Sequence, residues 1–442
     1  MKTITKTVKT FLVATIAITL VGSVSSCKKE GCTDSEANNY NDKAKDDDGS
    51  CAYDDESVTG TLSGDQTWGA NSVYFLEGKV IVPSGVTLTI DAGAIIKGRE
   101  GQETQASALV VAKGGKLIAN GTAAKPIIFT SELDDIEIGE LVGSNLTKVD
   151  NQLWGGIIIC GNAPVSTENG DTEGNIEGLN PDDGFGKYGG TDAADNSGSL
   201  SYVSIRHGGI SIGEGNEING LTLGGVGTGT SISNIEVYAT LDDGIECFGG
   251  TVNISNALVF YQGDDGIDLD QNYSGTISDF AVIHGDGIGT DEGLEIDGPE
   301  GSTNTDGMFT LSNGLCMSEG TADGSAGDFK SKAQGNITNV TFDYSSLGSK
   351  SVKIRSKYDD DCADKSDAMT NLKSGDLSFT NSTFSSVSVY DGDADDDGNS
   401  LCQDALDANQ TEAESLMTSG SGATIDPASL FSWTAAGQKG EL

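Results

Sequence analysis

The chain has 442 residues, with 25 lysines and arginines against 68 aspartates and glutamates, and a formal net charge of −43. A surface this acidic repels phosphate, so we expect neither a nucleic-acid nor a nucleotide partner, and no electrostatic docking on anionic lipid. Only two histidines are present, which argues against a histidine-rich zinc site or a Ser-His-Asp triad. Glycine is abundant (62 residues) and proline scarce (6), as in a chain with many tight turns.

The first residues predict export and a lipid anchor. Three lysines precede the apolar stretch 11–21, which is too short to span a bilayer and is typical of a signal peptide over residues 1–26. The following Val24-Ser25-Ser26-Cys27 resembles a bacterial lipobox, which implies cleavage before Cys27 and acylation of its thiol. We therefore expect an outer-membrane lipoprotein, displayed at the cell surface and held to the membrane by lipid. The alternative is an ordinary signal peptide followed by a disulfide cysteine.

Seven further cysteines would lie in an oxidising compartment. Cys32 and Cys51 bracket a short polar segment and form the first candidate disulfide; Cys362 and Cys402, in aspartate-rich loops, form the second. The others, in apolar strand patterns, are expected as buried thiols: Cys160, Cys247 and Cys316.

Residues 31–53 (GCTDSEANNYNDKAKDDDGSCAY) resemble a short disulfide-closed module of Bacteroidetes surface proteins. The segment is too small for a hydrophobic core and depends on its cross-link. We assign residues 27–56 to the lipid anchor and this aspartate- and asparagine-rich module.

A repeat fills the rest of the chain. Ser-Ile-Ser-Asn (231–234) recurs as Asn-Ile-Ser-Asn (253–256) and Thr-Ile-Ser-Asp (276–279), with looser copies that place the amide at 313, 339 and 381. Short alternating strands that repeat every twenty or more residues, with no helices between them, predict an all-β, single-stranded parallel β-helix over 57–400. A β-propeller would need longer repeats. The stacked amides should hydrogen-bond from coil to coil, and a helix over 401–418 should begin a C-terminal cap (401–442).

The segments WGANSVYFLEGKVIVPSGVTLTIDAGAIIKG and SALVVAKGGKLIANGTAAKPIIFTS resemble a family of Bacteroidetes surface lipoproteins with a right-handed parallel β-helix of the pectin-lyase-like type. The resemblance runs from Trp68 to Trp433 and implies the fold and the surface location, but no established chemistry. Insertions at 132–151, 166–198, 298–306 and 357–376 are expected to build a binding face.

Three consecutive coils are acidic. Alternation predicts that Glu246, Asp268 and Glu295 point outward one above another, with Asp270 and Asp297 beside them. Like charges one coil apart, about 4.8 Å, repel by roughly 3–4 kcal/mol at an effective dielectric near 20. This acidic ladder requires cations, raised pKa values or full hydration.

The order of Asp243, Asp264, Asp265 and His284 along successive coils resembles the active site of polygalacturonase-type glycoside hydrolases. The resemblance implies that Asp264 or Asp265 is the general acid, that the other and Asp243 activate water, and that His284 tunes them. The motifs depart from that family, because its Asn-Thr-Asp reads Leu-Asp-Asp (241–243) and its Gly-His-Gly reads Ile-His-Gly (283–285). Asp-Asp-Gly also has a purely structural use in turns.

A calcium loop is predicted near the C-terminus. The segment 393–404 fits the pattern D-x-D-x-D-G-x5-D, with carboxylate ligands from four positions and a backbone carbonyl from Asn399. The predicted ligands are Asp393, Asp395, Asp397, Asn399 and Asp404.

The sequence thus favours a non-catalytic, calcium-stabilised surface lipoprotein that binds glycan or mediates adhesion. Two alternatives stay open at this point: a polysaccharide-degrading enzyme that uses the stacked aspartates, and a purely structural surface protein. Phe248, Tyr261 and Tyr273 are the aromatic residues expected beside the carboxylates, where they would favour a sugar ligand.

Overall fold

The computed structural model describes residues 29–35, 37–51, 53–101, 105–213, 216–285, 291–320, 324–344, 351–395 and 398–442. The chain divides into two compact units, residues 1–53 and 54–442. In the first unit, the disulfide Cys32–Cys51 closes the small module, and the Tyr53 hydroxyl donates to the Asp34 carboxylate at 2.7 Å. No helix among the described residues is long and apolar enough to cross a membrane.

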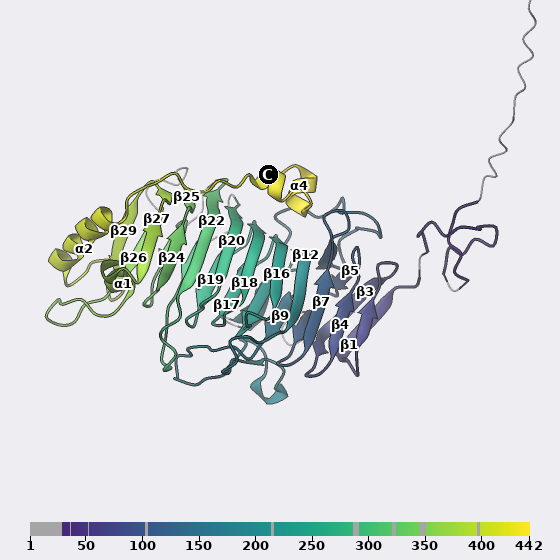
Figure 1. The fold of residues 1–442 in the computed structure, drawn as a ribbon, viewed down its shortest axis with the longest axis horizontal. Coiled ribbons are helices and arrows are strands. Elements are labelled where there is room, and N and C mark those ends of the chain that lie inside the picture. Colours follow the sequence, from purple (N-terminus) through teal and green to yellow (C-terminus); the bar gives the residue numbers. More distant parts are fainter. Residues whose placement is uncertain are drawn as a thin grey trace, which may run out of the picture. The chain divides into compact units, whose positions relative to one another are not determined.

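The second unit is a right-handed parallel β-helix, as the repeat predicted, with three faces that we name the serine face, the strap face and the carboxylate face (Figure 1). The serine face contains β2 (Gln66–Trp68), β4 (Thr87–Ile90), β7 (Lys116–Asn120), the first halves of β12 (Gly198–Arg206), β16 (Ser231–Tyr238), β18 (Asn253–Phe260), β20 (Thr276–His284) and β22 (Phe309–Ser318), then β24 (Gly335–Thr338) and β27 (Leu377–Thr380).

The strap face contains the beginnings of β1 (Glu56–Thr61) and β3 (Val73–Val82), then β5 (Ile95–Gly98) and β8 (Ile127–Ser131). It continues with the second halves of β12, β16, β18, β20 and β22, and ends with β25 (Thr341–Asp343) and β28 (Thr383–Phe384). The carboxylate face contains the ends of β1 and β3, β6 (Ala108–Val111), β9 (Ile157–Cys160), β15 (Leu221–Gly224), β17 (Ile245–Phe248), β19 (Ile267–Asp270), β21 (Leu294–Ile296), β23 (Gly327–Phe329), β26 (Val352–Ser356) and β29 (Val387–Asp391).

The remaining elements lie in insertions and at the C-terminus. Two antiparallel hairpins pair β10 (Gly174–Asn175) with β11 (Lys187–Tyr188) and β13 (Ile210–Gly213) with β14 (Asn216–Ile218). The helices are a 3-10 turn η2 (Pro181–Asp183), α1 (Ala368–Ser374), α2 (Gln403–Leu416), α3 (Pro427–Leu430) and α4 (Ala435–Lys439).

The repeated amide forms the corner between the serine face and the strap face. Asn234 and Asn256 have φ of 54° and 55°, a left-handed conformation that bends the strand and that asparagine tolerates better than most residues. The Asn256 amide donates to Asn234 Oδ1 at 3.1 Å, and Asn313 donates to Asp279 at 2.6 Å. The predicted coil-to-coil amide bonds are therefore present.

Alternate residues of each strand point inward and fill the interior of the solenoid. The residue between the two polar positions of each repeat is buried, as for Ile232, Ile254 and Ile277. Cys160, Cys247 and Cys316 are buried free thiols, as predicted. The inward column therefore supplies a continuous apolar core along the helix axis.

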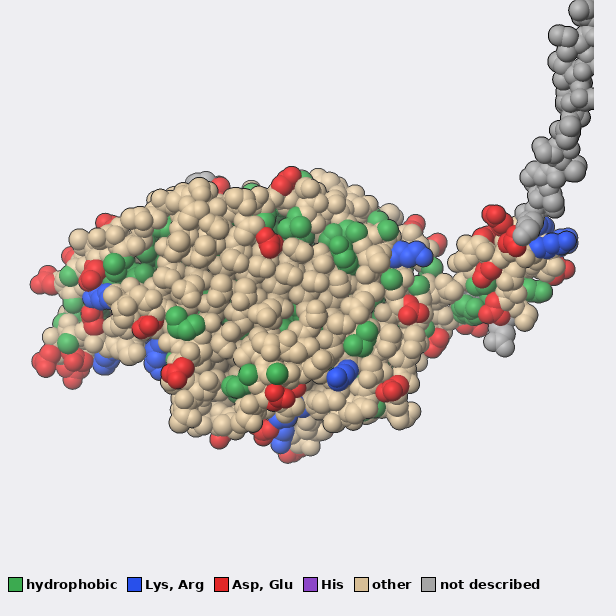
Figure 2. Space-filling view, in the orientation of Figure 1, with side chains coloured by type: hydrophobic (Ala, Val, Ile, Leu, Met, Phe, Trp, Pro, Cys, Tyr) green, Lys and Arg blue, Asp and Glu red, His purple; other side chains and the backbone are tan. Residues whose placement is uncertain are grey.

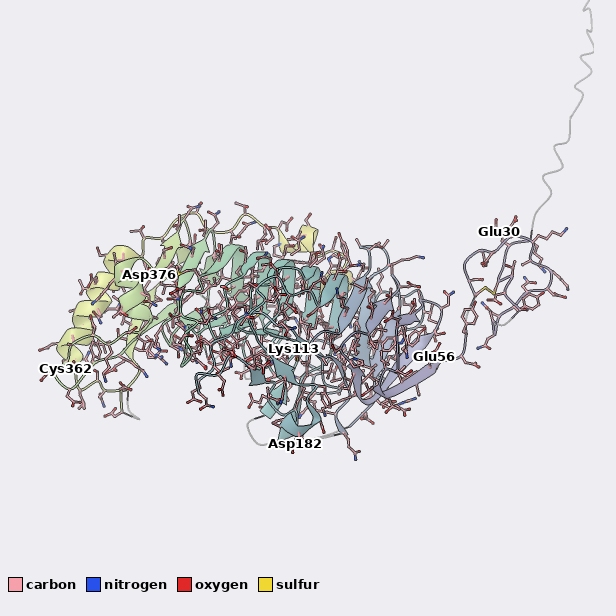
Figure 3. All side chains as sticks on the ribbon, turned by 60° about the horizontal axis from the view of Figure 1, so that its bottom comes forward. Glu30, Glu56, Lys113, Asp182, Cys362 and Asp376 are labelled. Atoms are coloured by element: carbon pink, nitrogen blue, oxygen red, sulfur yellow. A yellow bond between two sulfur atoms is a disulfide. The ribbon has the colours of Figure 1, made fainter. Side chains whose placement is uncertain are left out.

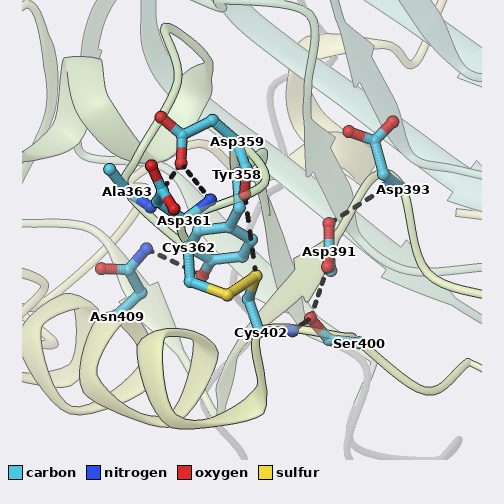
Figure 4. Close-up of a disulfide and its surroundings, with 10 residues drawn as sticks. All are labelled: Tyr358, Asp359, Asp361, Cys362, Ala363, Asp391, Asp393, Ser400, Cys402 and Asn409. Atoms are coloured by element: carbon cyan, nitrogen blue, oxygen red, sulfur yellow. Dashed lines mark hydrogen bonds between the residues drawn. A yellow bond between two sulfur atoms is a disulfide. The ribbon is translucent and has the colours of Figure 1, made fainter.

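The predicted C-terminal helix forms as α2 and packs on the last strand, β29. The disulfide Cys362–Cys402, the second candidate pair, joins the start of α2 to the 357–376 insertion (Figure 4). On the helix, Asn409 donates to the Tyr358 hydroxyl at 3.0 Å and to Asp364 at 3.0 Å. The cap therefore covers backbone groups that would otherwise be an unpaired sheet edge.

The last residues, 417–442, which we call the strap, run back along the solenoid to α4 (Figure 1). They cover an apolar part of the strap face, where Tyr238, Phe260 and Ile283 meet Phe431. At the end of the strap, the buried Glu236 carboxylate accepts from the backbone N–H groups of Ala435 and Ala436 at 2.8 and 3.0 Å.

Glu236 also faces a buried cation. The Arg206 guanidinium lies 3.9 Å from the Glu236 carboxylate, and the Ser204 hydroxyl bonds to both side chains. Glu236 therefore joins the core coils to the strap through a buried, charge-assisted network.

We expect Glu236→Ala to lower the free energy of unfolding by about 3–5 kcal/mol, because the change leaves Arg206 buried without its partner and frees the strap. Urea unfolding of the two proteins would measure the difference. Glu56→Ala, at an exposed position of β1, is the control and should change stability little. An equal effect of the two substitutions would contradict this role for Glu236.

Candidate functional site

The register of the carboxylate face stacks the acidic ladder. Glu246 pairs with Asp268, and Asp268 pairs with Glu295. The neighbouring residues Ile245 and Ile267 point into the core and are fully buried. Each strand therefore presents its acid to the outer side at the same height.

At the acidic coils this outer side is covered by other parts of the chain. The acidic ladder is therefore not freely hydrated. The 166–198 insertion, with β10 and β11, lies over it and is tied down by the Lys113–Glu173 ion pair (Figure 3, where Asp182 marks the insertion). Tyr188 stacks on Phe248 with ring centroids 5.6 Å apart. A Cβ at Gly224 would lie 2.6 Å from the Tyr188 ring, so this glycine makes room for the insertion.

The covered space is a cavity of about 240 Å³. Nine acidic side chains line it, from the coils, the insertion and the β13–β14 hairpin: Glu177, Glu217, Asp242, Asp243, Glu246, Asp264, Asp265, Asp268 and Glu295. Its other lining residues include Asn219, Thr222 and Phe248. A cavity this acidic is chemically suited to cations rather than to anions.

Two groups of three carboxylates converge in the cavity, each with oxygens within 4.8 Å of one another. One group is Asp242, Asp243 and Asp264; the other is Asp243, Glu246 and Asp268. Asp243 belongs to both groups, so the two sets of oxygens are continuous.

Basic residues neutralise only the far end of the carboxylate stack. Lys330 pairs with Glu295, and Lys353 lies 2.5 Å from Glu292 and 2.8 Å from Asp328. Among the described residues, no lysine or arginine forms an ion pair with a member of either group of three. These five carboxyl groups therefore have no basic partner among the described residues that would balance their charge when they ionise.

Two oxygens at the cavity also have no hydrogen-bond donor among the described residues: Asp268 Oδ1 and Asn219 Oδ1. Asn219 is only 4% exposed, and its amide nitrogen donates to Glu246. A buried oxygen without a donor is costly, so both oxygens are suited to a ligand that accepts lone pairs.

Burial is the first cause of the raised pKa values in this cavity. It raises the pKa of Asp242 to about 7, with the charge of Asp264 as the next cause, and the pKa of Asp264 to about 6. Burial and the neighbouring carboxylates also raise the pKa values of Asp243, Glu246 and Asp268 well above their usual range. Part of the cavity is therefore protonated at neutral pH when no cation is bound.

Asp265 and Glu295 share a proton. Burial, then the charge of Asp243, raises the pKa of Asp265 to about 12, so that Asp265 donates a hydrogen bond to Glu295. Burial pushes the pKa of Glu295 up, but this bond and Lys330 together hold it below its usual value. Asp270 and Asp297 lie beside the acidic ladder. Burial and the charge of Asp297 raise the pKa of Asp270 to about 8.

The structure brings together Asp243, Asp264 and Asp265 but not His284. The His284 ring is fully buried against Tyr344, with Nε2 2.9 Å from the Glu292 carbonyl oxygen, and it does not line the cavity. Burial lowers its pKa to about 3. The expectation that His284 shares one face with the aspartates is wrong, because the residue sits where β20 ends and turns into the interior.

Of the three expected aromatic residues, only Phe248 lines the cavity. Tyr273 is buried in the solenoid and donates to the Val252 carbonyl oxygen. Tyr261 packs in the cluster beneath the strap. Of the three, only Phe248 is therefore placed to contact a ligand at these carboxylates.

Two further expectations fall partly outside the described residues. Cys27 lies outside them, and so does Asp397 of the calcium loop. In the rest of that loop, Asp395 accepts from the backbone N–H of Asn399 at 2.7 Å, Asp393 lies 4.0 Å from Lys357, and Asp404 lies in the first turn of α2 (Figure 4 shows Asp393). The loop stays a prediction.

Sequence reasoning missed four residues of the site: Glu177, Glu217, Asn219 and Asp242. Asp242 adjoins Asp243 in the Leu-Asp-Asp-Gly motif, so this motif could have identified it as a site residue. Glu177 and Glu217 come from the 166–198 insertion and the β13–β14 hairpin, and no repeat pattern reports where such segments lie.

The long parallel sheet and the stacked corners form a parallel β-helix of the pectin-lyase-like class. The model of the pectate-lyase-like β-helix domain matches residues 60–437. The chain belongs to this family. No curated protein and no solved structure matches the chain.

The raised pKa values predict how stability depends on pH without divalent cations. The folded pKa values of the two histidines, about 4 and about 3, lie far below their unfolded value near 6.5, so above about pH 7.5 both are neutral in the folded and unfolded states. Asp242 and Asp270 have folded pKa values of about 7 and 8, above their unfolded value near 4. Their stabilising effect is complete below the unfolded pKa and disappears as the pH rises through the folded pKa. The melting temperature in EDTA should therefore fall from pH 7.5 to 8.5.

The control for this prediction is the double variant Asp242→Asn/Asp270→Asn, which should show a shallower fall in thermal melts over the same range. A melting temperature that rises with pH in wild-type protein would contradict the assignment.

Proposed function

We propose that this protein is a non-catalytic, exported lipoprotein of the cell surface that binds a hard divalent cation, calcium in the extracellular medium, in the acidic cavity, and that its β-helix binds glycan. The observation that carries the cation site is the pair of carboxylate groups that share Asp243 and have no basic partner among the described residues. The signal-peptide and lipobox patterns support the location.

The donor set fits calcium. All the candidate ligands are oxygens, from carboxylates and from the unpartnered Asn219 Oδ1. Calcium takes six to eight such ligands in flexible geometry, whereas zinc prefers nitrogen and sulfur. When bound, the cation would supply the positive charge that balances the five carboxylates. Asp242, Asp243, Glu246, Asp264 and Asp268 would hold it.

Binding rather than hydrolysis is supported by the form of the cavity. Its 240 Å³ lies below the 300–1,000 Å³ of ordinary ligand pockets, and the histidine of the hydrolase motif lies elsewhere. The carboxyls with raised pKa values are explained by burial and mutual repulsion.

Calcium should bind the mature chain with measurable heat, and calcium at 100 times its Kd should add about 2.7 kcal/mol to the free energy of unfolding. Asp243→Asn, which keeps the shape and removes the charge shared by both groups, should abolish most of this stabilisation. Isothermal titration calorimetry and thermal melts with calcium would measure both effects.

Asp393→Asn is the matched control, because it alters the predicted C-terminal loop and leaves the cavity intact. Loss of calcium binding in Asp393→Asn but not in Asp243→Asn would place the cation in the loop and overturn the cavity assignment.

A separate assay tests the hydrolase alternative. We expect no new reducing ends when the protein is incubated with polygalacturonate and calcium, because the cavity is too small to pass a polymer chain. Release of reducing ends that disappears in Asp264→Asn would make the protein an enzyme and overturn the proposal.

A further inference from the structure

The serine face carries an uncharged hydroxyl array on a strongly acidic protein. Over seven successive coils, the two outward columns contain only serine, threonine and asparagine. The first column is Ser199, Ser231, Asn253, Thr276, Thr310, Asn336 and Ser378, and the second is Ser201, Ser233, Ser255, Ser278, Ser312, Thr338 and Thr380.

Both columns point to solvent. The residue between them on each strand is turned inward, as for Ile254 (1% exposed) and Leu311 (0%). All fourteen side chains of the columns are partly or fully exposed. In Figure 2 the middle of the front face is mostly tan, the colour of uncharged polar side chains and backbone, while red and blue gather near its edges.

A shallow groove of about 510 Å³ runs over this array at β16, β18 and β20. Ser233, Ser255 and Ser278 line it, one coil after another. The hydroxyl columns therefore lie in a concave surface.

The array retains hydrogen-bonding capacity. Some neighbours bond to each other, as Ser233 does to Ser201 at 3.3 Å and Ser378 to Asn336 at 2.9 Å. Each hydroxyl offers one donor and two acceptor lone pairs, so such single bonds leave further positions for a ligand.

The chemistry of the face selects its ligand. A surface without charge gives no steering toward a polyanion or a polycation, and it lacks the tryptophan, tyrosine and arginine anchors of protein interfaces. Its regular hydroxyls and amides match a ligand that is itself uncharged, extended and covered with hydroxyls.

The array is regular along the solenoid axis. Adjacent coils are about 4.8 Å apart, and the two columns about 6.6 Å apart along the strand. Seven coils therefore span about 29 Å along the solenoid axis. An extended ligand that lies along the axis therefore meets an equivalent pair of polar side chains at each coil.

We propose that the serine face binds a neutral, extended polysaccharide that lies along the solenoid axis over the groove at β16, β18 and β20. This inference rests on the glycan-binding part of the proposed function and places that ligand away from the acidic cavity. Many weak hydrogen bonds, one set per coil, supply the affinity.

The experiment is depletion of the mature chain from solution by insoluble cellulose and by xylan, with polygalacturonate as the charged comparison. The neutral polymers should bind and polygalacturonate should not. Ser255→Arg/Ser278→Arg fills the groove with two long side chains and should weaken binding about tenfold or more. Ser415→Arg, on the exposed side of α2, is the matched control and should bind as wild type does.

Calcium titration and melting of each variant separate the outcomes. If the groove variant folds and binds calcium but keeps full affinity for the polymers, the serine face is not the site. If polygalacturonate alone binds, or if no polysaccharide binds while calcium does, the inference fails and the cation site stands. If calcium does not bind but the groove variant loses the neutral polymers, the inference stands and the cation site fails.

Discussion

Parallel stacking in register is the constraint on which this structure depends. Each coil places equivalent residues directly above those of the coil before, about 4.8 Å away. Columns of apolar residues then form the core and columns of asparagine form the corners. The same geometry forces acids into columns, where Glu246, Asp268 and Glu295 lie at equivalent positions. A column of like charge that is covered from water is stable only when protons, lysines or metal ions neutralise it, so the chemistry of the acidic face follows from the geometry of the backbone.

The three faces of the solenoid answer the problem of exposed surface in different ways. The strap covers the apolar face, an insertion covers the acidic face, and the serine face needs no cover because its hydroxyls are readily hydrated. On the acidic face, Lys330 and Lys353 replace the missing positive charge at one end of the stack. The other end lacks such residues among those described, and there the raised pKa values concentrate.

The fold could be predicted from the sequence because it is periodic. The copies of Ser-Ile-Ser-Asn revealed the coil, the corner asparagines and the inward isoleucines, and the two disulfide pairs followed from where the cysteines lie relative to the repeats. The candidate site was predicted only in its repeated half. Asp243, Asp264 and Asp268 lie on coils, whereas Glu177 and Glu217 come from segments that interrupt the repeat. His284 was misplaced because the spacing of residues gives the coil but not the end of the strand, where the chain turns the side chain inward.

The strap has a consequence for how the molecule unfolds and is made. A solenoid stabilised only by neighbouring coils can fray from either end, one coil at a time. Here the final residues return from the last coil to Glu236 in an earlier one, so contacts close across many coils at once. Opening the end coils then requires release of the strap, which couples local fraying to the middle of the solenoid. Because the strap follows all the coils in the chain, every coil is synthesised before the segment that ties the end of the solenoid to its middle.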